Sequence, residues 1–272
     1  MKVAFQGERG AYSEEAACGL LGDVAVLPCP RFRDVFEAVL SGQADRGVIP
    51  IENSQAGSIT DNFDLLLLHP VTVVAEFVLR VRHCLLGLPG QQLQDIKQAH
   101  SHPQALMQCE TFLRERGINS VAEYDTAGSA KMLAKDQLPG VAAIAGKRAA
   151  QIYGLTILAE DIETNPNNQT RFLCISLTTA PVVSSAKTSI ILGPRNSPGM
   201  LHRAMGSFAS RNINVTKLES RPRREGQWDY LFFLDFEGHR DNPQVKSALT
   251  EIEKENFLKV LGSYSKISGN PL

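Results

Sequence analysis

The first 180 residues repeat one pattern: a short apolar segment, a turn that contains Gly or Ser, and then an amphipathic segment with helical spacing. The pattern opens with residues 2–7 and 10–22 and closes with residues 141–145 and 146–154. Strands that alternate with helices of this length form parallel sheets covered by helices on both faces. Ligands bind to such sheets beyond the carboxyl ends of the strands. The pattern therefore predicts an α/β fold and makes the polar residues after each strand the first candidates for a site.

Two segments depart from this pattern. Residues 71–88 form one long extended run without a helix signal, long enough to pass from one sheet to a neighbouring one. Residues 155–177 read as a strand, a polar loop and a second strand that carries the chain back. Two such passages predict two α/β lobes with a cleft between them. We place lobe one at about 1–77 and 160–180, and lobe two at about 78–159.

The order of elements changes after residues 178–187, a stretch rich in Ser, Thr and Pro that reads as a linker. Beyond it the chain reads strand, helix, strand, strand, helix, strand, which is the ferredoxin-like βαββαβ order. At roughly 150 residues per domain, 272 residues suggest one large domain or two smaller ones. We therefore predict a first domain over residues 1–180 and a second over residues 187–272.

Charge and composition exclude several classes of protein. The chain has 28 Lys and Arg against 29 Asp and Glu, a net charge of −1, and so offers no basic field for nucleic acid or an anionic membrane. No apolar run approaches the roughly 20 residues that span a bilayer. The cysteines are odd in number and never spaced as CxxC, which predicts reduced thiols in a cytoplasmic protein without a structural zinc site. They are Cys18, Cys29, Cys84, Cys109 and Cys174.

The usual catalytic and metal-binding motifs are missing from the sequence, which contains no HExxH, GxSxG or GxGxxG and no phosphate-binding GxxxxGK loop. Of the histidines, only His100 and His102 are close together, and no Cys or carboxylate partner lies beside them to complete a metal site. We therefore predict no metal, and we expect His102 to help start a helix at Pro103.

Polar residues gather at four predicted helix N-termini. The N-terminus of a helix offers unpaired N–H groups and a partial positive charge, and so binds carboxylates or phosphates. Each N-terminus taken alone is explained as ordinary N-capping. Four of them, each after a parallel strand, favour a small anionic ligand. They are residues 7–13, 52–58, 101–104 and 125–129.

One further polar segment, Asn167–Phe172, leads into a strand. It reads either as a solvated turn, with Arg171 on the surface and Phe172 in the core, or as part of a site. In an extended segment Thr170 and Phe172 lie on one face and Arg171 on the other. A threonine hydroxyl beside an aromatic ring suits a ring-shaped ligand that carries a polar substituent.

Five motifs follow one another along the chain: Glu52–Asn53–Ser54 with Gly57, Ser101–Ala105, Asp125–Ala130, Thr170–Arg171–Phe172 and Glu219–Pro222. In this order, and with the second domain, they resemble the prephenate dehydratase family from end to end. The resemblance implies a two-lobed catalytic domain, like a periplasmic binding protein with an interlobe cleft, followed by a regulatory ACT domain. No mutase-like helical segment precedes Lys2, so we expect a monofunctional enzyme.

The resemblance implies a carbon–oxygen hydro-lyase that converts prephenate into phenylpyruvate, carbon dioxide and water for phenylalanine biosynthesis, with no cofactor. It assigns Thr170 to the leaving hydroxyl as the catalytic residue. Phe172 forms a wall beside the ring, and Arg171 holds a carboxylate or, as its pleat direction favours, braces the cleft. Other polar residues hold the carboxylates and orient the ring. These are Asn53, Ser54, Ser101, Thr126 and Ser129.

The resemblance also implies that L-phenylalanine binds the ACT domain and inhibits the enzyme. Glu219 takes the ammonium group, unless Glu219 and Arg221 form surface ion pairs instead. Met200 stands where the family has alanine and narrows the pocket. A ferredoxin-like unit with one exposed sheet edge predicts a homo-oligomer, either a dimer or a tetramer built as a dimer of dimers. The effector residues are Asn196, Ser197, Pro198, Gly199, Met200, Leu201, Glu219, Ser220, Arg221 and Pro222.

Two alternative functions stay open at this point. Phe5–Gln6–Gly7 stands where many bacterial family members have a Gly–Pro turn, and this variant looks like the arogenate dehydratases of plants. The two substrates differ only in an amino or a keto group, and the sequence does not rank them. A non-catalytic solute sensor with an attached amino-acid-binding domain explains the cleft equally well, although no DNA-binding helix or membrane segment is present to receive its signal.

Overall fold

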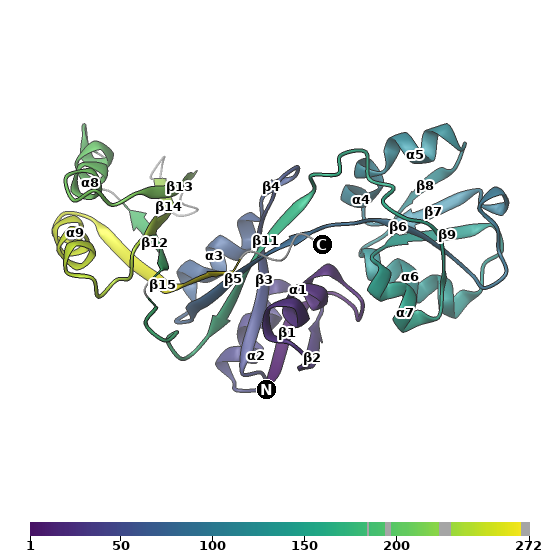
Figure 1. The fold of residues 1–272 in the computed structure, drawn as a ribbon, viewed down its shortest axis with the longest axis horizontal. Helices are drawn as coiled ribbons and strands as arrows, with labels where there is room; N and C mark the ends of the chain where they lie inside the picture. The colour runs from purple at the N-terminus through teal and green to yellow at the C-terminus, as the bar shows by residue number, and fades with distance from the viewer. Residues whose placement is uncertain (184, 194–196, 223–229, 268–272) are drawn as a thin grey trace. The chain divides into compact units, whose positions relative to one another are not determined.

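A computed structural model describes residues 1–183, 185–193, 197–222 and 230–267 of the protein (Figure 1). These residues form two compact units. Of the described residues, the first unit contains Met1–Thr60 and Phe77–Phe172, and the second contains Asp61–Glu76 and residues 173–267. The contacts thus group a segment of the predicted first domain with the C-terminal elements, a different division from the predicted boundary at residues 180–187.

The first sheet of unit one is parallel at its centre, as its alternation of strands and helices predicts. Strand β1 pairs in parallel with β2 and β3, and Val3, Ala4 and Phe5 are fully buried, as expected of a strand covered on both faces. The short strand β4 pairs with β3, and β11 follows β3 in the sheet. The elements are β1 (Lys2–Gln6), α1 (Tyr12–Leu21), β2 (Ala25–Cys29), α2 (Phe32–Leu40), β3 (Arg46–Asn53), β4 (Gly57–Ser58) and β11 (Gln169–Ser176).

The extended run predicted over residues 71–88 is two strands that belong to different sheets, β5 (Thr72–Arg80) and β6 (Cys84–Gly87). Residues 81–83 separate them, so the chain does pass between sheets here, as predicted. The second sheet, with order β10-β6-β9-β7-β8, is parallel only within β8, β7 and β9. Strand β6 runs antiparallel to both of its neighbours, β9 and β10.

Helices cover both faces of the second sheet. Successive residues of its strands face alternate sides, so Leu86 and Ala143 pack against α6 and α7, whereas Leu85 and Ala142 pack against α4 and α5. The helix predicted from Pro103 is two short helices with a break at Cys109. His102 caps the first of them, accepting the Gln104 N–H on Nδ1, as predicted. The elements are η1 (Leu93–Asp95), β7 (Gln98–Ser101), α4 (Pro103–Gln108), α5 (Glu110–Glu115), β8 (Asn119–Ala122), α6 (Thr126–Asp136), β9 (Val141–Ala145), α7 (Lys147–Tyr153) and β10 (Thr156–Ala159).

The two lobes of unit one touch through a buried carboxylate on α1. Glu14 accepts hydrogen bonds from the Gly10 N–H at 2.6 Å, from Arg148 at 2.8 Å and from Arg9 at 3.1 Å, and its side chain is fully buried. Burial disfavours the charged form, but the Gly10 N–H and the two guanidinium groups outweigh it and lower the pKa of Glu14. The ionised carboxylate therefore ties α1 of lobe one to α7 of lobe two.

Unit two contains the predicted ferredoxin-like domain. Its strands lie in the order β13-β14-β12-β15 with every pairing antiparallel, and α8 and α9 bury Ile190, Leu234 and Phe236 on one face of the sheet. In the part of the chain that the structure describes, no helix is both long and apolar enough to cross a membrane. The elements are β12 (Ala186–Gly193), α8 (Met200–Ala209), β13 (Val215–Pro222), β14 (Tyr230–Glu237), α9 (Pro243–Glu253) and β15 (Phe257–Ile267).

The other face of this sheet packs on α3 (Thr60–Leu68), which comes from the predicted first domain. Phe233 points away from the α8–α9 side, and its ring centroid lies 4.3 Å from that of Phe63. Lys259 donates to the last carbonyl oxygens of α3, those of Leu66 at 2.8 Å and His69 at 2.7 Å among them. A cation at a helix C-terminus interacts favourably with the helix dipole, so this lysine anchors α3 to β15.

The lobes approach each other so closely at Gly10 that a side chain at this position would clash with the other lobe. Its φ is +88°, and a Cβ atom would lie 2.7 Å from the backbone Cα of Ala149. We expect Gly10→Ala to lower the free energy of unfolding by about 3 kcal/mol, the sum of left-handed strain and overpacking. Gly42 has a φ of +74° with open space around it, so Gly42→Ala should cost only about 1 kcal/mol. Urea unfolding curves measure both changes, and equal losses would contradict a contact between the lobes at Gly10.

Candidate functional site

The predicted catalytic segment lies beside the end of β3. The N–H of Ser54 donates to the carbonyl oxygen of Gln169 at 2.8 Å. The Ser54 hydroxyl accepts the Gln169 N–H at 3.0 Å and donates to the carbonyl oxygen of Asn167 at 3.0 Å. These bonds hold the start of β11 against the Glu52–Asn53–Ser54 motif. Two motifs more than a hundred residues apart in the sequence thus form one site.

Asn53 connects this pairing to Thr170. The Asn53 side chain accepts the backbone N–H groups of Gln55 at 3.0 Å and Ala56 at 2.9 Å, so the accepting atom is Oδ1. Its Nδ2 then donates to Thr170 Oγ1 at 2.9 Å and to Asn168 Oδ1 at 2.8 Å, and the Gln169 carbonyl oxygen is a third, more distant acceptor at 3.2 Å. Thr170 is 8% exposed and receives this bond as an acceptor. Its own hydroxyl hydrogen remains to donate, and no residue that the structure describes accepts it.

The strand places Arg171 and Phe172 on opposite faces, as the pleat predicts. Arg171 Nη1 lies 3.2 Å from Glu52 Oε1, and the arginine side chain is 11% exposed. This ion pair joins β11 to β3, and the role of Arg171 as a brace of the cleft or as a carboxylate ligand stays a prediction. Phe172 is 2% exposed, so its ring lies in the core of the protein. Its assignment as a wall beside the substrate ring stays a prediction.

Behind Asn53, buried polar side chains form a row that the sequence reasoning missed. Asn168 Nδ2 donates to Gln108 Oε1 at 3.0 Å, and the same oxygen lies 2.8 Å from His83 Nε2. His83 Nδ1 lies 2.8 Å from the Tyr12 hydroxyl. We call these five residues, with Asn53 as the first, the buried polar row. The sequence signal for this row is a polar residue at a core-facing position. His83 lies in the long extended run 71–88, and Gln108 lies on the buried side of α4.

Burial also sets the charge of His83. The ring is 2% exposed, and desolvation lowers its pKa, while the hydrogen bond to Gln108 and the charge of Glu163 oppose that shift. The net direction is downward from the ordinary value near 6.5, so the imidazole is neutral at pH 7. A neutral imidazole has one donor and one acceptor nitrogen, so it donates a hydrogen bond on one side of the row and accepts one on the other.

The helix N-termini predicted to hold carboxylates are arranged differently from the Thr170 site. Ser101 donates to the carbonyl oxygen of Ile144 at 2.7 Å, and Ser129 donates to that of Asp125 at 2.7 Å, so both hydroxyls bond to backbone. Asp125 caps α6 and accepts the Glu8 N–H at 3.0 Å, which brings the other lobe to this helix. Thr126, at the start of α6, lies 3.4 Å from the Asp125 carboxylate. The substrate-binding roles of Ser101, Thr126 and Ser129 stay predictions.

The residues predicted to bind an effector lie around the start of α8 and along β13. Asn196 falls outside the described residues, and Gly199 is the N-cap of α8 in a left-handed conformation with φ +80°. Met200 is 5% exposed. Glu219 pairs with Lys217 at 3.2 Å, and Arg221 Nη1 lies 3.0 Å from Asp64 of α3. The motif on β13 therefore contacts α3, a segment of the predicted first domain, through Arg221.

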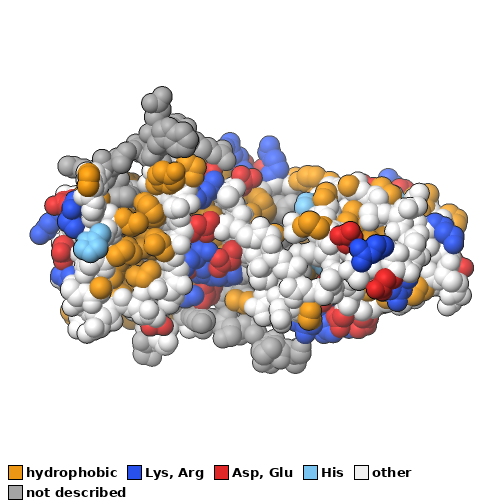
Figure 2. Space-filling model, turned by 90° about the horizontal axis from the view of Figure 1, so that it is seen from above, with side chains coloured by type: hydrophobic (Ala, Val, Ile, Leu, Met, Phe, Trp, Pro, Cys, Tyr) orange, Lys and Arg blue, Asp and Glu red, His pale blue; other side chains and the backbone are white. Residues whose placement is uncertain are grey.

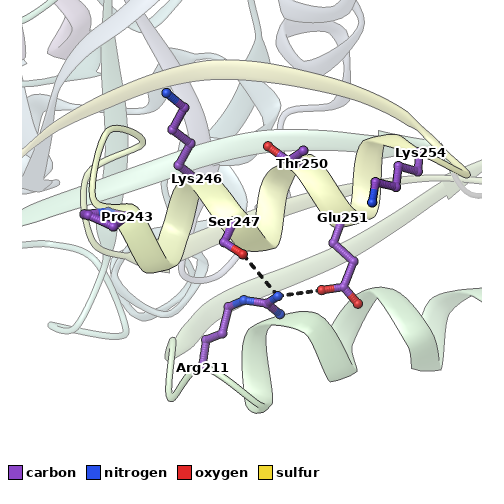
Figure 3. Close-up of a pocket in the computed structure, with 7 residues that line it drawn as sticks. All are labelled: Arg211, Pro243, Lys246, Ser247, Thr250, Glu251 and Lys254. Atoms are coloured by element: carbon purple, nitrogen blue, oxygen red, sulfur yellow. Dashed lines mark hydrogen bonds and ion pairs between the residues drawn. The ribbon is translucent and has the colours of Figure 1, made fainter.

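A cavity of about 530 Å³ lies elsewhere, along α9. Figure 3 shows that the guanidinium of Arg211 points to Ser247 at 3.2 Å and to Glu251 at 2.7 Å. This cation is therefore already paired with α9. None of the residues predicted for catalysis or for effector binding lines the cavity, whose lining residues are Arg211, Pro243, Lys246, Ser247, Thr250, Glu251 and Lys254.

Comparisons with known proteins place both parts of the chain. The family model described as prephenate dehydratase matches residues 3–180, and the model described as ACT domain matches residues 188–254. The chain is 45% identical to the arogenate dehydratase/prephenate dehydratase 2 of Arabidopsis thaliana, a chloroplastic protein, over 97% of this chain and 72% of that protein.

Two solved structures are similar over nearly the whole chain. The prephenate dehydratase from Arthrobacter aurescens, in complex with L-Phe, has a TM-score of 0.89 at 32% identity and covers 98% of this chain and 90% of its own. GqqA, described as a novel type of quorum quenching acylase, has a TM-score of 0.91 at 34% identity and covers 98% of both chains. Both similarities extend over the first and the second predicted domain.

The Arg171–Glu52 pair gives a test of the bracing role. Lysine keeps the charge but loses the planar fork of arginine, so we expect Arg171→Lys to lower the free energy of unfolding by about 1 kcal/mol. Glu52→Gln should lower it by a similar amount, and the double variant by less than the sum, because the two residues share one interaction. Denaturation curves measure all three. An unchanged stability for Arg171→Lys, with only the KM for substrate raised, would place Arg171 on the substrate instead.

Proposed function

The chain belongs to the prephenate dehydratase family, and we propose that it converts prephenate into phenylpyruvate, carbon dioxide and water. One observation carries the assignment of the reacting residue. The Thr170 hydroxyl, in the Thr–Arg–Phe motif, accepts its bond from Asn53 and keeps its own hydrogen for a ligand. A donor held in this way suits a reaction in which a hydroxyl group departs.

The reaction needs little from the protein beyond a donor and an orientation. Loss of the ring carboxylate together with the C4 hydroxyl makes the ring aromatic, which drives the reaction forward. The barrier lies in the departure of hydroxide, a poor leaving group unless it receives a hydrogen bond or a proton. Such assistance is typically worth about 10²–10⁴ in rate. Thr170 donates to the departing oxygen as negative charge builds on it.

Positioning of the substrate is assigned to the surrounding motifs. Asn53 and Ser54 hold the start of β11 in place, as their bonds to Thr170 and Gln169 indicate. Ser101, Thr126 and Ser129, each at or next to a helix N-terminus, are proposed to orient the carboxylates, with the helix N–H groups as donors. No metal or organic cofactor is part of this proposal.

Two observations favour arogenate as a second substrate. The Arabidopsis relative at 45% identity carries both activities in its name. Phe5–Gln6–Gly7 in this chain is also the variant that looks like the plant enzymes. An assay for the aromatic product with prephenate and arogenate side by side ranks the two substrates. A protein that leaves both unchanged while binding them would be the non-catalytic sensor.

The role of Thr170 is tested by two substitutions that differ in one group. Thr170→Ala removes the hydroxyl, and we expect kcat to fall at least about a hundredfold with little change in KM, because the lost bond forms in the transition state. Thr170→Ser keeps the hydroxyl and should retain most of the turnover. Steady-state production of phenylpyruvate measures both variants. A Thr170→Ala enzyme with near-normal kcat would remove Thr170 from the mechanism.

We further propose that the C-terminal domain binds L-phenylalanine and that the protein is a homo-oligomer. The N-terminus of α8 at Gly199 offers N–H groups to the effector carboxylate, and the solved Arthrobacter relative is in complex with L-Phe. Strand β13 is the last strand of the sheet order, an edge that can pair with a second copy. The hydrophobic side chains of Leu218, Tyr230 and Phe257 are exposed on this unit. Figure 2 shows hydrophobic side chains gathered in a patch on the face of the molecule that it presents. The free thiols of all five cysteines support a cytoplasmic location.

Met200 offers a test of the effector site that leaves catalysis alone. Because Met200 is larger than the alanine usual at this position, Met200→Ala should widen the pocket and lower the phenylalanine concentration for half inhibition several-fold. Met205, one turn later on α8, packs in the core on the same helix, so Met205→Ala is the matched control and should not change that concentration. Inhibition curves on the full-length enzyme measure both. Equal effects of the two substitutions would place the effector elsewhere.

A further inference from the structure

The buried polar row that begins at Asn53 has only one possible direction. Backbone N–H groups hold Asn53 Oδ1, so Asn53 Nδ2 is the donor toward Asn168, at 2.8 Å. Asn168 Oδ1 is therefore an acceptor, and the other end of the same amide, Nδ2, donates to Gln108 Oε1 at 3.0 Å. The Gln108 oxygen is therefore an acceptor, and it also faces the next residue of the row, His83.

His83 completes the row in a single tautomer. Its Nε2 faces the accepting oxygen of Gln108 at 2.8 Å, so Nε2 carries the hydrogen. The neutral ring then has no hydrogen on Nδ1, so the single hydrogen of the Tyr12 hydroxyl is shared between Nδ1 at 2.8 Å and the Arg82 carbonyl oxygen, to which it donates at 2.9 Å. Glu163 holds the backbone N–H of His83 at 2.9 Å. At 2% exposure for His83, water does not compete for these bonds.

We propose that His83 is a positioning residue that holds Asn168, and through it Asn53, firmly in place beside the Thr170 hydroxyl. Its Nε2–H holds the Gln108 oxygen toward Asn168, which keeps the Asn168 oxygen toward Asn53 and the Asn53 amide hydrogen toward Thr170. Without that donor, the Gln108 oxygen keeps only the bond from Asn168, and Gln108 no longer holds Asn168 firmly against Asn53. Asn53 would then be placed less firmly beside Thr170, and the Thr170 hydroxyl would be directed less firmly at the ligand. The inference rests on the proposed function, in which Thr170 serves the departing hydroxyl.

The test compares two replacements of His83 in the full-length enzyme. His83→Leu removes the donor, and we expect kcat to fall about tenfold with KM little changed, the size of one lost hydrogen bond of ordinary net strength. His83→Gln places an amide N–H near the position of Nε2 and should recover most of the lost turnover. If His83 had only a structural role, both variants would lose activity in proportion to their loss of stability. Thermal unfolding, measured beside the kinetics, gives that loss of stability.

A double variant shows whether His83 acts through Thr170. In a Thr170→Ala background, His83→Leu should lower kcat by less than about twofold, because the group that His83 positions is already gone. An effect as large as in the wild-type background overturns the inference. A wild-type protein that makes no aromatic product from either substrate overturns the proposed function itself. A wild type that turns over, with His83→Leu unchanged, overturns only the positioning role.

Two tyrosine variants keep the inference testable should His83→Leu fail to fold. Tyr12→Phe removes the hydroxyl that faces His83 Nδ1 and frees the ring to change tautomer, so kcat should fall several-fold. Tyr153→Phe is the matched control: this hydroxyl donates to the Arg9 carbonyl oxygen at 2.8 Å, at the same contact between the lobes but outside the buried polar row. Equal kcat values for the two variants would contradict the inference.

Discussion

The side chain of Asn53 sets the hydrogen-bond directions around Thr170. Two backbone N–H groups of the turn after β3 hold its oxygen, and so its nitrogen has to donate, to Thr170 on one side and to Asn168 on the other. An amide that was free to rotate would leave the Thr170 hydroxyl without a fixed role, because a hydroxyl both donates and accepts. The backbone turn therefore determines, through one amide, which way the hydrogen bonds of Asn53 to Thr170 and Asn168 run. The same constraint extends inward, where Asn168, Gln108 and His83 are each left with a single arrangement.

That arrangement requires the two lobes to keep their positions relative to each other, because His83 and Gln108 belong to lobe two and Asn53 belongs to lobe one. The contacts between the lobes are short and buried. Gly10 approaches Ala149 closely, and the carboxylate of Glu14 bonds to Arg148 across the interface. A buried carboxylate with three donors is costly to move, because any displacement leaves a charge without its partners. The position of Thr170 relative to the buried polar row thus depends on interactions some distance away from it in the sequence.

Within unit two, the C-terminal domain packs on α3, the helix that follows the Asn53 segment in the chain. After Asn53 the chain continues through β4 into α3, and α3 packs on the C-terminal sheet through Phe63 and its last carbonyl oxygens. Arg221, in the motif assigned to the effector, pairs with Asp64 on that helix. An effector that changes the position of β13 therefore acts on α3 directly. The physical requirement for inhibition is a difference in effector affinity between two states, typically about 1–3 kcal/mol.

The sequence by itself determined the kinds of element, the order in which they follow one another and the motifs that identify the family. Hydrophobic periodicity is a local property, so the strands, the helices and the βαββαβ order of the second domain follow from it directly. The pleat rule likewise placed Arg171 opposite Thr170. Only the tertiary structure decided which polar residues meet: Gln108 and His83 bond to each other, and Asn168 joins them to Asn53. The local sequence shows each of them only as a polar residue and does not show its partner. It also showed that Ser101 and Ser129 bond to backbone carbonyls, and that α3 belongs with the C-terminal sheet. These are long-range pairings, and buried polar groups find their partners by proximity in space, which no spacing along the chain records.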